Sequence, residues 1–153
     1  MKKYLDYIIL AVSLVFGVLA LALMAAPGVV ANLGFFGTGS ETVFEVMSDN
    51  LGDGTSVGVV FTLIFAILGL LAPICLCLTK ILKVKLPVGY IAFCFALFAL
   101  LCGILAFCTK SFFLAGQAEG ESVKLGAGAI CTGIFSILNA LTLGCYGVMN
   151  LKK

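Results

Sequence analysis

The 153-residue sequence contains no histidine, no arginine and no tryptophan, and only 10% of its residues are charged. Histidine is the commonest general base and metal ligand at neutral pH, so its absence weighs heavily against an enzyme and against a metal centre. The net charge of +2 is dispersed along the chain, whereas a nucleic-acid partner requires clustered basic residues. We therefore expect no catalytic residue, no cofactor, no metal site and no nucleic-acid partner.

Hydrophobic residues make up 63% of the chain, and the mean hydropathy is +1.27. Soluble domains carry about 25% charged residues, so this composition indicates a bilayer as the partner of most of the chain. Four apolar runs without a lysine or a carboxylate are each long enough to cross a hydrocarbon core of about 30 Å as a helix. They cover residues 7–26, 57–78, 88–108 and 125–148.

These runs predict one all-α membrane domain over residues 1–153, an antiparallel bundle of four transmembrane helices with short connections. The outer loops are residues 27–56 and 109–124, and the inner loop is residues 79–87. Pro73 predicts a kink in the second helix. The first run follows two lysines, as in a signal peptide, but it is longer than the roughly 7 to 15 residues of a signal core, so we expect an uncleaved span.

The lysines predict the orientation of the bundle. With the inner loop in the cytoplasm, seven lysines lie inside and two outside, which agrees with the positive-inside rule. The inner set is Lys2, Lys3, Lys80, Lys83, Lys85, Lys152 and Lys153, and the outer set is Lys110 and Lys124. We therefore expect a multi-pass protein of the plasma (cytoplasmic) membrane with both termini in the cytoplasm.

The first outer loop predicts a short amphipathic helix from Ser40 to Leu51, lying on the outer surface. Thr42 and Glu45 have the spacing of a capping box at its start. Phenylalanine pairs in the two outer loops, 35–36 and 112–113, are expected to cap the bundle or to enter the lipid.

Four carboxylates repeat every four residues through this loop, which predicts an acidic outer face. They are Glu41, Glu45, Asp49 and Asp53. A solvated face is the favoured interpretation, and a face that binds cations weakly is the alternative. An EF-hand is excluded, because Leu51 occupies a ligand position and Val60 replaces the bidentate glutamate.

Small residues recur at helical spacing in the third and fourth spans, which is the pattern of close helix packing in membranes. The third span places Ala92, Ala96, Ala99 and Gly103 on one seam, and the fourth places Gly128, Thr132, Ser136, Ala140 and Gly144 at intervals of four. The seam of the fourth span is the contact that we expect to mediate association.

Asn139 is the one strongly polar side chain near the middle of a span, and an amide in hydrocarbon needs a partner. Ser13 lies at a similar depth, so we expect Asn139 to bond to Ser13 or to a backbone carbonyl. The seven cysteines all lie in or at the edge of a span, where they fill space. Cys75 and Cys77 are candidates for lipidation, and a disulfide between Cys108 and Cys131 is compatible with their depth.

The layout of four spans with a longer first outer loop resembles claudin-like and MARVEL-like tetraspan proteins. The claudin loop is marked by tryptophans and a cysteine pair, which this chain lacks. The resemblance therefore implies a layout and transfers no residue role or activity.

These patterns favour a non-enzymatic membrane protein that acts through helix association, with itself or with another membrane protein. The alternative is an oligomeric channel, cation-selective if the acidic loop forms its vestibule. Its pore would be lined by Asn139, Thr132, Ser136 or Thr142 from several copies.

Overall fold

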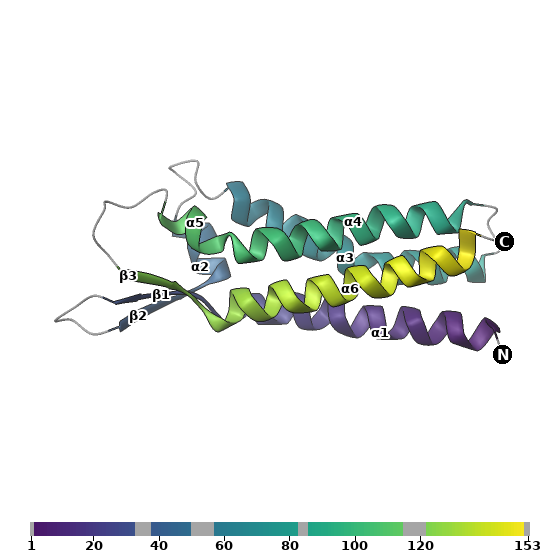
Figure 1. Ribbon diagram of the computed structural model, residues 1–153, viewed down its shortest axis with the longest axis horizontal. Coiled ribbons are helices and arrows are strands. Elements are labelled where there is room, and N and C mark those ends of the chain that lie inside the picture. The colour runs from purple at the N-terminus through teal and green to yellow at the C-terminus, as the bar shows by residue number, and fades with distance from the viewer. Residues whose placement is uncertain (1, 33–37, 50–56, 83–85, 115–121, 152–153) are drawn as a thin grey trace.

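The computed structural model describes residues 2–32, 38–49, 57–82, 86–114 and 122–151, and its main feature is a set of four long helices (Figure 1). All four are long and apolar enough to cross a membrane, which confirms the prediction of a multi-pass membrane protein. They are α1 (Lys2–Ala22), α3 (Val57–Ile81), α4 (Val88–Phe107) and α6 (Ala127–Leu151). A short 3-10 turn, η1 (Leu23–Ala25), extends α1.

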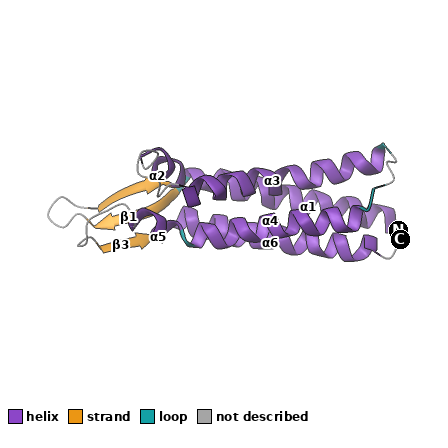
Figure 2. Cartoon of the chain, turned by 90° about the horizontal axis from the view of Figure 1, so that it is seen from above, coloured by secondary structure: helices purple, strands orange, loops and turns teal. Residues whose placement is uncertain are grey.

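Each long helix packs mainly on two others. α1 contacts α3 and α6, while α4 contacts the same two helices, and α3 meets α6 much less. The chain begins and ends at one end of the bundle, and the strands lie at the other (Figures 1 and 2). We call the first the lysine end, because α1 starts there with Lys2 and Lys3 and Lys80 lies there, and the second the sheet end.

The segments between the helices contain a three-stranded antiparallel sheet that the sequence analysis did not predict. Its strands are β1 (Pro27–Asn32), β2 (Thr38–Thr42) and β3 (Ser122–Leu125), in the order β2-β1-β3. Val30 of β1 lies opposite Ser40 on one side and Lys124 on the other. The description all-α therefore holds for the spans but not for the segments 27–56 and 109–124 between them, where the strands lie.

The helix of the first loop is shorter than predicted and is packed rather than superficial. α2 runs over Val43–Asp49, because the preceding residues pair with β1. The predicted capping box is present: the Thr42 amide donates to Glu45 Oε2 at 2.7 Å, and the Glu45 amide donates to Thr42 Oγ1 at 3.1 Å. Val43 and Val46 of α2 are buried, so the helix is held against the bundle. Leu51 lies outside the described residues.

A hydrophobic core at the sheet end joins the sheet to the helices. Met24, Val29, Val46 and Val59 are buried in it together with Phe113 of α5 (Thr109–Leu114). Phe112 is half-buried, so the second phenylalanine pair caps the bundle, whereas residues 35–36 lie outside the described part. A second core at the lysine end contains Leu10, Ala72, Leu76, Ala92, Leu143 and Tyr146.

Candidate functional site

The amide of Asn139 joins three helices in the middle of the bundle. Asn139 belongs to α6 and is 2% exposed. Ser13 of α1 donates through Oγ to Asn139 Oδ1 at 2.5 Å, and Asn139 Nδ2 donates to the backbone carbonyl of Gly69 in α3 at 3.2 Å. The structure thus contains the hydrogen bond to Ser13 that the sequence led us to expect, together with one to a backbone carbonyl.

The carbonyl of Gly69 is available because Pro73 lies four residues later in α3. In an α-helix the amide of residue 73 would donate to the carbonyl of residue 69, but proline has no N–H. An unsatisfied carbonyl in hydrocarbon costs several kcal/mol. Asn139 supplies the missing donor from another helix, and α3 continues through Pro73 to Ile81. This arrangement stabilises the backbone and leaves the amide little capacity for a ligand.

Other polar side chains of the spans also bond within the chain. Thr132 Oγ1 donates to the carbonyl of Ala20 at 3.1 Å, and Ser136 Oγ contacts Cys102 Sγ at 3.4 Å. Thr142 is half-buried and donates to carbonyls of its own helix. Among the residues expected to line a pore, Asn139, Thr132 and Ser136 are buried inside one chain.

A buried ion pair, which the sequence analysis missed, links α1 to α3 at the lysine end. Lys80 Nζ donates to Asp6 Oδ2. The Asp6 side chain is 3% exposed and that of Lys80 is 20% exposed. Because Asp6 precedes the apolar run by one residue, the predicted spans held no charge, whereas the first span of the structure, Tyr4–Ala25, includes it. Charges within membrane spans are costly unless paired and mark candidate functional sites.

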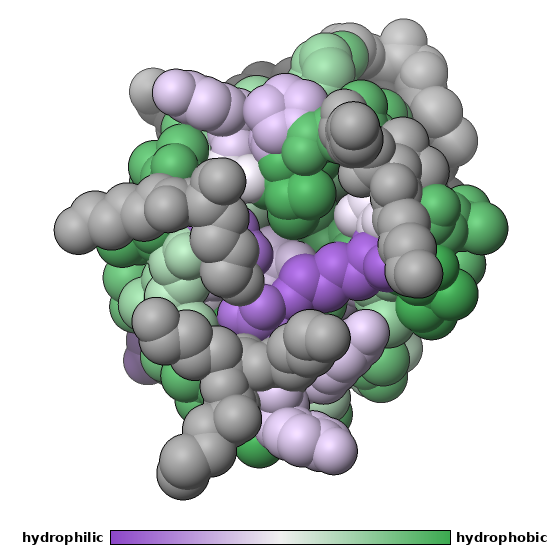
Figure 3. Space-filling model, turned by 90° about the vertical axis from the view of Figure 1, so that its right-hand side faces the viewer, coloured by the Kyte–Doolittle hydropathy of each residue, from purple (hydrophilic) through white to green (hydrophobic). Residues whose placement is uncertain are grey.

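Two tyrosine rings surround the same ammonium group. Lys80 Nζ lies 5.5 Å from the centroid of the Tyr7 ring and 5.1 Å from that of Tyr146, both within the range of cation–π attraction. Tyr146 is fully buried, and its hydroxyl has no hydrogen-bond partner among the described residues. Figure 3 views the lysine end, where hydrophilic surface gathers near the middle of a hydrophobic rim.

The small residues of the predicted seams are packed within one chain, where Gly103 of α4 meets α6 and the first part of the α6 seam meets α1 and the residues that follow it. A Cβ at Gly128 would collide with the carbonyl of Ala26, and a Cβ at Gly103 would crowd Ile137. Other seam residues are buried as well, with Ala96 half-buried. They are Ala92, Ala99, Thr132, Ser136 and Ala140.

Gly144, at the end of the seam, differs from the rest. A Cβ added there meets nothing within 4 Å. Gly144 and Ala140 line a shallow apolar groove of about 560 Å³ between α6 and Phe93 of α4. This part of the seam is open to whatever surrounds the chain.

The acidic residues of the first loop do not share one helix, contrary to expectation. Glu41 belongs to β2 and Glu45 to α2. The side chain of Asp49 and the whole of Asp53 lie outside the described part of the chain. All seven cysteines are free, including Cys108 and Cys131.

No protein-family model matches this chain, and no curated protein or solved structure is detectably similar to it.

Proposed function

We propose that this is a non-enzymatic multi-pass membrane protein that acts through helix–helix association, as a homo-oligomer or as an accessory subunit beside another membrane protein. The observation that carries the proposal is the open groove at Ala140 and Gly144. Ser13, Thr132 and Asn139 bond inside the chain, so the surface left for recognition in the bilayer is apolar and shaped by small residues.

The groove has the properties of a helix-docking surface. Ala140 and Gly144 are four residues apart, and small residues at this spacing let a second backbone approach closely. Leu141 and Val148, at its sides, are 61% and 53% exposed. Association between helices in lipid depends on close van der Waals packing, since lipid tails remove the hydrophobic driving force. The rest of the seam is filled by the chain itself, which restricts the proposed contact to the lysine-end half of α6.

The proposal is tested by replacing Gly144 with leucine and measuring assembly by native mass spectrometry after gentle release from the membrane. Because no atom of the chain lies near the added Cβ, Gly144→Leu leaves the bundle folded but fills the groove. We expect the complex to dissociate or to weaken at least tenfold. A closed stoichiometry of identical chains in the parent would identify a homo-oligomer, and a fixed second protein would identify an accessory subunit.

Cys75→Leu is the matched control. Cys75 is exposed on α3, six residues before the end of that helix, a depth close to that of Gly144 in α6. A leucine there places the same apolar side chain on another exposed face of the bundle. Equal assembly of the Gly144→Leu and Cys75→Leu variants would refute the groove as the contact.

The channel alternative has less support. Three of the four candidate pore residues are buried in one chain, and Glu41 and Glu45 lie on separate elements. A ring of identical subunits whose cation current falls when Glu41 and Glu45 are neutralised would favour it over an accessory subunit.

We also propose that the lysine end faces the cytoplasm and that the protein resides in the plasma membrane. The support is the distribution of lysines in the sequence: seven flank the spans on the side of the lysine end, and two flank them on the other side. The buried ion pair does not weaken this argument, because Asp6 neutralises only one of the seven.

A further inference from the structure

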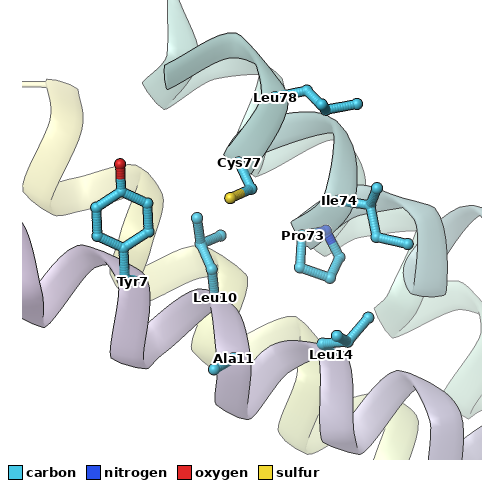
Figure 4. A pocket seen from close by; sticks show the side chains of 8 residues that line it. All are labelled: Tyr7, Leu10, Ala11, Leu14, Pro73, Ile74, Cys77 and Leu78. Carbon is cyan, nitrogen blue, oxygen red and sulfur yellow. The ribbon is translucent and has the colours of Figure 1, made fainter. Parts of the chain in front are cut away.

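We draw no further inference here: the strongest candidate, the apolar crevice between α1 and α3 that Tyr7, Ala11, Pro73 and Cys77 line (Figure 4), carries none, because nothing in the structure shows what covers it.

Discussion

Pro73 removes a backbone hydrogen bond from α3, and the side chain of Asn139 in α6 replaces it. The carbonyl of Gly69 loses its helical donor at Pro73 and receives the side-chain amide of Asn139. Pro73→Ala would restore the helical donor and make the amide redundant at that carbonyl. The two substitutions should therefore be coupled.

We predict that Asn139→Leu lowers the free energy of unfolding by about 2 kcal/mol in the parent and by about 1 kcal/mol less in the Pro73→Ala background. Reversible denaturation in mixed micelles measures the free energy of unfolding of the parent, of Asn139→Leu, of Pro73→Ala and of the double variant. Ser13→Ala is the control, because Ser13 bonds to the other atom of the amide, Oδ1, and should combine additively with Pro73→Ala. If the effects of Asn139→Leu and Pro73→Ala were also additive, the Gly69 carbonyl would have a donor other than Asn139.

The sequence alone allowed part of this site to be predicted. The position of Asn139 within an apolar run shows that it needs a partner, and Ser13 was foreseen from its depth. The link to Gly69 was not foreseen, although the spacing of four residues before Pro73 identifies the orphaned carbonyl. Which side chain reaches it depends on how α6 packs against α3. Similarly, Gly128 and Gly144 look equivalent in sequence, and only packing distinguishes them.

At the scale of elements, the ion pair of Asp6 and Lys80 holds α1 against α3. We predict that Lys80→Met lowers the free energy of unfolding by about 3 kcal/mol, because it removes the ammonium group that pairs with the buried Asp6 carboxylate. The double variant Asp6→Asn/Lys80→Met should lose less than half as much. Denaturation in the same micelles ranks the two variants. A double variant as unstable as Lys80→Met would show that cation–π contacts of Lys80 outweigh the pairing.

The long helices were predictable because their signal is local: each is a run of apolar residues of the length that a bilayer requires. The sheet was not, because two of those helices, α3 and α4, lie between β1 and β3 in the sequence. Val29 and Val30 form too short a β-branched run to be recognised without a partner strand. Thr38 to Thr42 was assigned in part to a helix for the same reason.

For the molecule as a whole, the sheet, α2 and α5 gather at one end and the buried ion pair and tyrosines at the other (Figure 1). The two ends therefore present different chemistry to the two sides of a membrane. The sheet end offers strands with open edges within the described residues, and the lysine end offers positive charge. Orientation is the property that determines which partners and lipids each end meets.

We predict that the sheet end faces outward, and a cysteine at Lys124 reports this directly. Lys124 is exposed on β3, and Leu82 is exposed just beyond α3 at the lysine end. A membrane-impermeant maleimide should label Lys124→Cys in intact cells and Leu82→Cys only after permeabilisation. The parent, whose cysteines lie in or next to the long helices, gives the background.

The opposite labelling pattern would contradict the orientation and place the lysine end outside. Replacing Lys124 does not itself favour that result, because it removes one of the two outer lysines and makes the asymmetry seven to one. A steeper asymmetry drives the lysine end more strongly into the cytoplasm. Labelling of Leu82→Cys in intact cells would therefore mean that another determinant of topology overrides the lysines.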